Sequence, residues 1–254
     1  RDIYSQECSR KQKLQEKLHR VFHQYGFEDI ETPTFEYFEV FSKEVGTIPS
    51  RELYKFFDRE GNTLVLRPDF TPSVSRACAT YFNPEKEVVS LCYTGNTFIN
   101  NSSFRGRLKE TTQMGVERMG DDSPEADAEI LAMTVECLLA TGLTEFQVSV
   151  GQVDYYKAIF AQTGMSQEEE EELRELISQK NYFGVEELVK NKNMDKSLAR
   201  VLSQLPQMFG STEVLEKAKS LTDNPQALKA VARLEEIYEL LKVYGYEKYV
   251  TFDF

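Results

Sequence analysis

Two long strand-like runs, residues 88–98 and 108–119, constrain the fold of this chain more than any other feature. A polar turn, Asn100-Asn101-Ser102-Ser103, separates them and is followed by Phe104-Arg105-Gly106-Arg107. Runs of this kind on either side of a polar turn predict two neighbouring antiparallel strands. Helical patterns surround the pair, so we predict an α+β fold in which helices cover an antiparallel sheet.

The periodicity of the N-terminal part predicts further elements. Apolar residues at helical spacing, ended by Gly26, predict an amphipathic helix over residues 5–25. Residues 54–58 and 63–66 flank Glu60-Gly61-Asn62 and predict a hairpin. Thr71 and Ser123 each precede a proline and predict capped helices at about 72–82 and 124–141. Residues 145–151 alternate like a strand.

From residue 155 to about 246 the pattern is helical throughout, with leucine, valine and isoleucine at three- and four-residue spacings. We predict three parts: a core over residues 1–154, an all-helical insertion over 155–248, and a strand at 249–254 that returns to the core. The insertion is either a compact structural lobe or a contact for a partner. Because the chain begins without methionine and ends on that strand, we expect the protein to continue beyond residue 254.

The charge balance argues against nucleic acid as a partner. Lys and Arg number 30 against 42 Asp and Glu, so the formal net charge is −12, whereas a protein that holds tRNA usually shows a basic face. The densest charged run, residues 168–172, is acidic. No apolar stretch is long enough to span a membrane and no signal peptide is visible. We expect a cytoplasmic protein that does not bind tRNA.

Cysteines and histidines would reveal a metal or redox site. The four cysteines are scattered without a CxxC pair, which is typical of reduced thiols rather than of a disulfide framework or a zinc site: Cys8, Cys78, Cys92 and Cys137. His19 and His23 lie one helical turn apart, as metal ligands on a helix do. The sequence shows no further ligand near them. We therefore predict no metal site, and nothing indicates a cofactor.

The segment from Leu91 to Gly120 resembles motif 2 of the class II aminoacyl-tRNA synthetases, and within them of the histidyl-tRNA synthetases. That motif reads roughly Phe-Arg-x-Glu, a short loop, Gly-Arg, and then Gln-x-Gly-x-Glu. The chain matches the later part without a gap, at Gly106, Arg107, Gln113, Gly115 and Glu117. The resemblance covers about residues 1–155 and the last strand, and it implies a synthetase-like fold.

The first part of the motif has lost its charged residues. Where the family has an arginine that contacts the α-phosphate of ATP, this chain has Ile99, and where the family has a glutamate it has Asn101. Losing one well-placed charge at a transition state typically costs about 3–4 kcal/mol. We therefore expect no aminoacylation and assign no catalytic residue. The alternative is that Arg105 or Arg107, past the turn, reaches the same phosphate.

The residues that bind the amino acid in the family match this chain better than those that contact ATP. The two-residue period of a strand places Gln113, Gly115 and Glu117 on one face, and the two polar side chains can lean over the bare glycine. This predicts a slot for a small polar ligand. In the family the matching glutamate takes an imidazole N–H, and the matching glutamine binds the amino-acid head group. Asp69 and Thr71 match the stretch that binds the α-amino group, so the resemblance implies a histidine site of Asp69, Thr71, Gln113 and Glu117.

Matches to the same family continue upstream. Residues 1–5 resemble an N-terminal segment of the synthetase, and Tyr25-Gly26-Phe27, Ile30 and Thr32-Pro33 resemble motif 1. The proline of that motif helps to form the dimer interface in the family. The resemblance therefore implies a homodimer formed around Thr32-Pro33.

Where the chain departs from the synthetase, it resembles a second branch, the regulatory subunits of ATP phosphoribosyltransferase. That enzyme catalyses the first step of histidine biosynthesis. These paralogues keep the synthetase fold, lack aminoacylation and occur with the short form of the catalytic subunit. The phrase from Leu66 to Pro72 looks like theirs. The resemblance implies a non-catalytic, histidine-sensing subunit whose partner is the short-form catalytic chain. Two alternatives stay open: an active fragment of a histidyl-tRNA synthetase, and a small-molecule-binding scaffold of the same fold.

Overall fold

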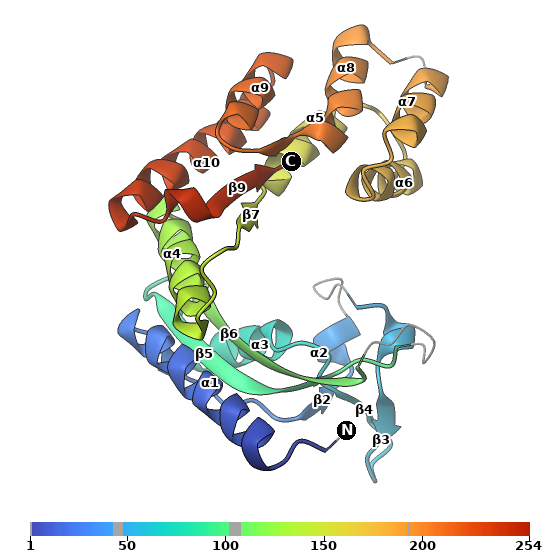
Figure 1. Ribbon diagram of the computed structural model, residues 1–254. Helices are drawn as coiled ribbons and strands as arrows, with labels where there is room; N and C mark the ends of the chain where they lie inside the picture. Colours follow the sequence, from blue (N-terminus) through green and yellow to red (C-terminus); the bar gives the residue numbers. More distant parts are fainter. Residues whose placement is uncertain (1, 43–47, 102–107, 193) are drawn as a thin grey trace. The chain divides into compact units, whose positions relative to one another are not determined.

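The computed structural model describes residues 2–42, 48–101, 108–192 and 194–254 (Figure 1). The chain forms two compact units, residues 1–122 and residues 123–254. The residues around the motif 2 turn that the sequence singled out, Arg105, Gly106 and Arg107, lie outside the described residues.

The first unit holds the predicted core hairpin. Its helices are α1 (Ser5–Gln24), α2 (Glu39–Ser42) and α3 (Thr71–Tyr81), with the 3-10 turn η1 (Ser50–Glu52). Its strands are β1 (Glu28–Asp29), β2 (Phe35–Tyr37), β3 (Lys55–Phe57), β4 (Thr63–Leu66), β5 (Val89–Phe98) and β6 (Glu110–Met119). One sheet has the order β1-β5-β6 and a second has the order β2-β4-β3.

The long hairpin and the first helix confirm the sequence predictions. Strands β5 and β6 pair antiparallel from Val89 opposite Met119 to Phe98 opposite Glu110, and β3 and β4 form the second predicted hairpin. Strand β1 joins β5 in parallel, so this sheet is mixed rather than purely antiparallel. The reason is that the chain leaves α1 through Gly26, whose φ of +78° suits glycine, and runs alongside β5.

Helices cover both faces of the hairpin sheet. The face that carries Leu91 and Tyr93 packs on α3 and the residue before it, in a core of Phe70, Val74, Cys78, Val89, Leu91 and Tyr93. The face that carries Cys92 is turned towards α1, from which Lys11 donates to Thr112 Oγ1 at 2.5 Å. Figure 1 shows α1 running along the β5–β6 pair. The two faces therefore offer two chemically separate environments, because neighbouring residues of a strand point in opposite directions.

The second unit is mostly helical. Its helices are α4 (Pro124–Thr141), α5 (Val153–Phe160), α6 (Gln167–Ser178), α7 (Tyr182–Asn191), α8 (Lys196–Gln204), α9 (Glu213–Leu221) and α10 (Pro225–Tyr244). The 3-10 turns are η3 (Leu205–Gln207) and η4 (Glu247–Tyr249), and the strands are β7 (Val148–Val150), β8 (Phe209–Gly210) and β9 (Val250–Asp253). Strand β9 lies between β7, to which it is parallel, and β8, to which it is antiparallel.

Several predictions for this unit are confirmed and one is wrong. Ser123 caps α4 by accepting a hydrogen bond from the Ala126 N–H at 3.1 Å, as predicted. The apolar spacings of residues 155–246 form the helical core, in which Leu173, Leu202, Leu205 and Leu234 are almost completely buried. The expectation of helices alone in this stretch is wrong, because β8 pairs with β9. A strand of two residues is too short to produce a periodic signal.

The compact units and the predicted domains divide the chain differently. The boundary between the units falls at residues 122 and 123, where α4 begins, because α4 shares contacts with α10 and Asp127 pairs with Arg233 at 2.8 Å. The predicted division at residues 154 and 155 rests on the change of sequence pattern and stays a prediction. In the described part of the chain, no helix combines the length and the apolar character needed to cross a bilayer.

Candidate functional site

The structure brings the four predicted histidine-site residues together. Gln113 and Glu117 lie on β6, Asp69 lies in the connection from β4 to α3, and Thr71 is the first residue of α3. The Thr71 hydroxyl donates to Glu117 Oε1 at 2.6 Å. The Gln113 amide donates to Asp69 Oδ1 at 3.3 Å. Two residues of the strand are thus joined to two residues at the start of the helix in one half-buried group.

Thr71 does not cap α3, contrary to the prediction from the Thr-Pro pair. The N-cap position belongs to Phe70, which makes no side-chain capping bond. The N–H of Phe70 donates instead to Asp69 Oδ1 at 2.7 Å. The hydroxyl of Thr71 is therefore available for the contact with Glu117, because Thr71 already lies in the first turn of the helix.

Tyr93 is a further residue of the candidate site, and the sequence pattern did not predict it. It lies directly opposite Gly115 in the hairpin, and Gln113 donates to its hydroxyl at 3.4 Å. A Cβ atom at residue 115 would lie 2.6 Å from Tyr93 Cζ. The space above the glycine, which predicted a ligand slot, therefore holds the phenol end of Tyr93. This contact depends on the pairing register of the two strands, which the length of the turn between them sets. The periodicity of the sequence does not give that register, so it did not predict the contact.

A layer of aromatic and guanidinium groups supports Tyr93. The rings of Phe70 and Tyr93 are stacked, with centroids 4.3 Å apart, and the guanidinium carbon of Arg67 lies 4.0 Å from the centroid of Phe70. A Cβ at Gly95 would lie 2.5 Å from Arg67 Nη2 and 2.7 Å from Phe70 Cζ. Gly95 therefore allows this layer to approach the strand.

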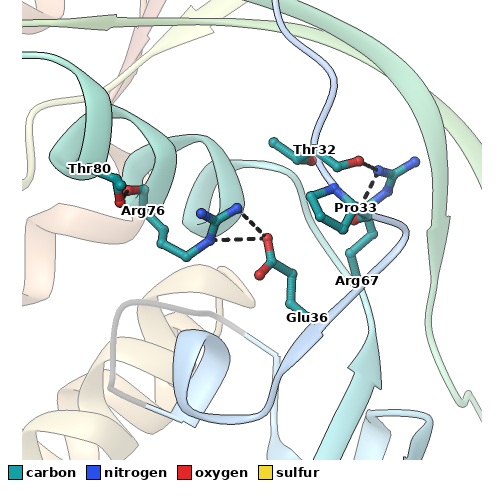
Figure 2. A network of polar contacts seen from close by, with 6 residues as sticks. All are labelled: Thr32, Pro33, Glu36, Arg67, Arg76 and Thr80. Carbon is teal, nitrogen blue, oxygen red and sulfur yellow. Dashed lines mark hydrogen bonds and ion pairs between the residues drawn. The ribbon is translucent and has the colours of Figure 1, made fainter.

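Arg67 also holds the motif 1 segment against the hairpin. Its Nη1 donates to the carbonyl oxygens of Thr32 at 2.9 Å and Pro33 at 3.3 Å, as Figure 2 shows. Its Nε donates to the Asn96 carbonyl at 2.8 Å. Arg67 is 7% exposed, so the arginine of the Arg-Pro-Asp stretch is committed to backbone groups. The segment before β2 is thereby fixed next to the candidate site.

A second polar contact in Figure 2 joins α3 to β2. Arg76 donates to Glu36 Oε1 from Nη2 at 2.8 Å and from Nε at 3.2 Å. The Glu36 side chain is 6% exposed, and that of Arg76 is 34% exposed. Because an almost buried carboxylate needs a charged partner, this pair sets the position of the helix that carries Thr71.

The electrostatics of the candidate site follow from burial and from two neighbouring carboxylates. Burial raises the pKa of Glu117 above its ordinary value, and the nearby charge of Asp69 adds to this effect. Hydrogen bonds from Thr71 and Tyr93 act in the opposite direction. The pKa of Tyr93 is raised by burial and by the same two carboxylates. A ligand with N–H donors or a positive charge would relieve this concentration of negative charge.

The positions of the lost activation residues carry no positive charge. Ile99 follows the end of β5, is half-buried, and donates its N–H to the Lys109 carbonyl at 3.0 Å. The Asn101 side-chain amide donates to the Leu108 carbonyl at 3.4 Å. Both residues therefore act in the local structure of the hairpin end. Whether Arg105 or Arg107 substitutes for the missing arginine concerns residues outside the described ranges.

A second cluster of polar side chains lies on the α1 face of the same sheet. His19 and His23 of α1, Asp29 of β1 and Cys92 of β5 have potential metal-ligand atoms within 4.8 Å of one another. The statement that no further ligand lies near the histidines is therefore wrong. A hydrogen bond with His19 lowers the pKa of Asp29, and burial raises the pKa of Cys92 to about 12.

Comparisons with known proteins agree with this architecture. A sequence model of the family described as histidyl-tRNA synthetase matches residues 1–254. The ATP phosphoribosyltransferase regulatory subunit of Acetivibrio thermocellus is 40% identical over 252 residues, 99% of this chain and 60% of that protein. The subunit of the same name from Clostridium acetobutylicum is 36% identical over 255 residues, 100% of this chain and 63% of that protein. The chain thus spans about three fifths of the length of these relatives.

Solved structures give the same result. A protein of Bacillus halodurans C, described as an ATP phosphoribosyltransferase regulatory subunit/histidyl-tRNA synthetase, has a TM-score of 0.88 at 32% identity, covering 100% of this chain and 66% of that one. Histidyl-tRNA synthetase from Nostoc sp. PCC 7120 has a TM-score of 0.77 at 19% identity, covering 97% of this chain and 57% of that one, which supports the fold alone. The chain therefore belongs to the histidyl-tRNA synthetase family, and within it resembles the proteins named ATP phosphoribosyltransferase regulatory subunit.

Proposed function

We propose that this chain is the synthetase-like part of a regulatory subunit of ATP phosphoribosyltransferase, without catalytic activity of its own. The names of its relatives at 36–40% identity support this role. The uncharged Ile99 and Asn101 support the absence of amino-acid activation, because nothing at those positions stabilises charge on the α-phosphate. The net charge of −12 supports the absence of tRNA binding.

We further propose that the subunit senses histidine through Asp69, Thr71, Gln113 and Glu117. The observation that carries this proposal is the pair of contacts that joins Thr71 to Glu117 and Gln113 to Asp69. Four residues that the resemblance to the synthetase motifs selected, from segments more than 40 positions apart, thereby meet in one group.

Each side chain has chemistry for one part of histidine. Glu117 accepts an imidazole N–H with its carboxylate, and burial strengthens that bond by excluding water. Both described hydrogen bonds to Asp69 use Oδ1, so we assign Oδ2 as the acceptor for the α-ammonium group. The Thr71 oxygen accepts from the same ammonium while its O–H continues to donate to Glu117 Oε1. When the ligand binds, the Gln113 amide gives up its hydrogen bond to Asp69 and donates to the head group of the ligand.

Histidine occupancy acts on a partner, which we propose to be the short-form catalytic subunit. A chain that binds an amino acid without turning it over has an effect only if occupancy changes another equilibrium. If histidine favours one state of the complex, that state must bind histidine more tightly, and the coupling is reciprocal. A coupling of about 1–3 kcal/mol corresponds to a change of roughly 5- to 150-fold.

The test combines a protein that contains this whole chain with the purified short-form catalytic subunit. Catalytic activity is measured on mixing and during a histidine titration, with the native sequence, Glu117→Gln, and the matched control Glu110→Gln. Glu110 lies on the same strand, is exposed and points to the other face. We expect the histidine response to depend on Glu117 and not on Glu110. If mixing and histidine leave the catalytic chain unaffected, the scaffold alternative replaces this proposal.

An assay of histidine-dependent ATP–pyrophosphate exchange separates the regulatory role from the synthetase alternative. We expect no exchange above background, because Ile99 provides no charge at the α-phosphate. Turnover by the purified protein would contradict the proposal. In that case Arg105→Ala and Arg107→Ala would identify the substituting cation.

We also propose that the subunit is a homodimer through the region around Thr32-Pro33. Strand β2, which follows this segment, is an edge strand, and its Phe35 and Tyr37 are 52% and 54% exposed. An edge strand with exposed aromatic residues favours an interface in which a second chain buries that edge. Light scattering at micromolar concentration should give the dimer mass, and Tyr37→Glu should shift it to the monomer. A monomeric native protein would exclude this interface.

A further inference from the structure

The group of His19, His23, Asp29 and Cys92 is unusual in its composition and convergence. The chain has two histidines in 254 residues, and both belong to this group. His19 Nε2 lies 2.5 Å from Asp29 Oδ1, and His23 Nε2 lies 2.9 Å from Asp29 Oδ2. The Cys92 sulfur lies 3.6 Å from Asp29 Oδ1. Two imidazoles and a thiol thus surround one carboxylate.

The backbone fixes these positions before any ligand binds. His19 and His23 are one turn apart on α1, so their rings leave the same side of the helix, with centroids 4.1 Å apart. Asp29 pairs with Cys92 in the register of β1 and β5, and the Ile30 N–H donates to the Cys92 carbonyl at 2.9 Å. Two ligands therefore come from one helix turn, and two come from one strand pair.

The distances suit a tetrahedral metal ion. With metal bonds of about 2.0–2.3 Å, the ligand atoms of a tetrahedral zinc site lie roughly 3.3–3.6 Å from one another. The four candidate atoms lie within 4.8 Å of one another. To admit the ion, the carboxylate would have to move away from His19 Nε2 by less than about 1 Å, and the widest ligand pairs would have to close by roughly 1–1.5 Å. Rotation of side chains that are 38–58% exposed, those of His19, His23 and Asp29, can supply this movement.

The donor set selects the kind of ion. Imidazole nitrogen and thiolate sulfur favour Zn²⁺ over Mg²⁺ and Ca²⁺, which prefer oxygen ligands. Four protein ligands complete a tetrahedral shell, which is the arrangement of structural rather than catalytic zinc sites. Cys92 is 0% exposed and forms the floor of the cluster, while the other three side chains form its open rim.

We propose that His19, His23, Asp29 and Cys92 bind one Zn²⁺ ion that joins α1 to the β1–β5 strand pair. This site is separate from the proposed histidine site, because Cys92 points to the opposite face of the sheet from its neighbour Tyr93. The ordinary alternative is that Asp29 accepts hydrogen bonds from two surface histidines while Cys92 packs as a small apolar residue. The zinc site and this alternative differ in whether the Cys92 sulfur binds a metal ion.

The experiment titrates Zn²⁺ into chelator-treated protein by calorimetry and uses Co²⁺ as a spectroscopic probe. We expect one equivalent of Zn²⁺ to bind, no binding of Mg²⁺, and a thiolate-to-cobalt absorption band in the near ultraviolet. Cys92→Ser keeps the size of the side chain but should abolish the band and weaken Zn²⁺ binding more than about 100-fold, beyond the loss from a supporting contact. Zn²⁺ should raise the melting temperature of the native protein and not of the variant.

Two control variants separate the site from general thiol binding. Cys8→Ser removes a thiol from the same helix, and Cys78→Ser removes another buried thiol of the same unit. Both should keep the band and the affinity. His23→Gln, at a side chain 46% exposed, tests the site without disturbing the core if Cys92→Ser fails to fold. Absence of stoichiometric Zn²⁺ binding overturns the proposal, as does binding that is unchanged in His23→Gln or in folded Cys92→Ser.

Discussion

The Thr71 hydroxyl donates a hydrogen bond to Glu117 Oε1 at 2.6 Å and so joins the first residue of α3 to strand β6 of the hairpin sheet. The bond spans 46 positions of sequence and ties together the two segments that hold the candidate histidine site. Thr71 can make this bond because Phe70, and not Thr71, holds the N-cap position of α3. The contact makes the site sensitive to single substitutions at either end.

Replacing Glu117 with glutamine should weaken histidine binding by about 1.5–3 kcal/mol, the range for a hydrogen bond to a charged group. The change keeps the size of the side chain and removes the charge that favours an imidazole N–H. Isothermal calorimetry on a protein that contains this whole chain measures the effect, with Glu110→Gln as the same change on the other face of β6. Equal affinities for the native protein and Glu117→Gln would refute the assignment.

Replacing Thr71 with valine should weaken histidine binding, whereas serine should preserve it. Valine has the same shape but lacks the hydroxyl, so the half-buried Glu117 carboxylate loses the hydrogen bond from Thr71. We expect a loss of about 1–3 kcal/mol in binding free energy for Thr71→Val. Calorimetry on both variants checks this difference. A serine variant as weak as the valine variant would assign the effect to packing of the methyl group.

The stability of the protein should carry a pH signature of Glu117. Burial raises the folded pKa of this carboxyl above its ordinary value of 4.5. The folded state then binds the proton more tightly, so this contribution to stability is present below the unfolded pKa and is lost as pH rises through the folded pKa. Glutamine does not titrate, so Glu117→Gln removes this pH-dependent loss of stability. The free energy of unfolding of the variant relative to the native protein should therefore increase from about pH 4 upward, as measured by urea denaturation.

Adding a methyl group at Gly115 should displace Tyr93. The new Cβ would lie 2.6 Å from Tyr93 Cζ, so the ring must move or the hairpin must bend. We expect Gly115→Ala to lower the free energy of unfolding by about 1–3 kcal/mol. In a double-mutant cycle with Tyr93→Leu, which removes the obstructing ring, the cost of the alanine should shrink. Additive effects in this cycle would show that the two residues do not meet.

Breaking the contact between Arg76 and Glu36 should destabilise the first unit. Arg76→Met keeps much of the aliphatic stem but removes the cation that forms hydrogen bonds with the almost buried Glu36 carboxylate. Because about a third of Arg76 is exposed, we expect about 1–2 kcal/mol rather than the 3–5 kcal/mol of a fully buried pair. Arg174→Met, which breaks an exposed pair with Glu171, should change stability by less than about 1 kcal/mol. Equal losses in urea denaturation would contradict the role of burial.

Local patterns in the sequence were sufficient for the elements that depend on neighbouring residues. The spacing of apolar side chains and the glycine at residue 26 determined α1, and Ser123-Pro124 determined the start of α4. The strand period placed Gln113, Gly115 and Glu117 on one face, and the resemblance to the synthetases selected Asp69 and Thr71. These features follow from periods of 3.6 and 2 residues and from capping chemistry, which act within a few positions of the chain.

The tertiary structure decided which distant residues meet. Pairing register alone brought Tyr93 over Gly115, and the parallel pairing of β1 with β5 brought Asp29 to Cys92 and both to the histidines of α1. The hydroxyl of Thr71 donates to Glu117 of another element rather than capping α3, because Phe70 holds the N-cap position. Such contacts depend on the register in which strands pair across long separations in sequence. Local sequence patterns do not determine that register.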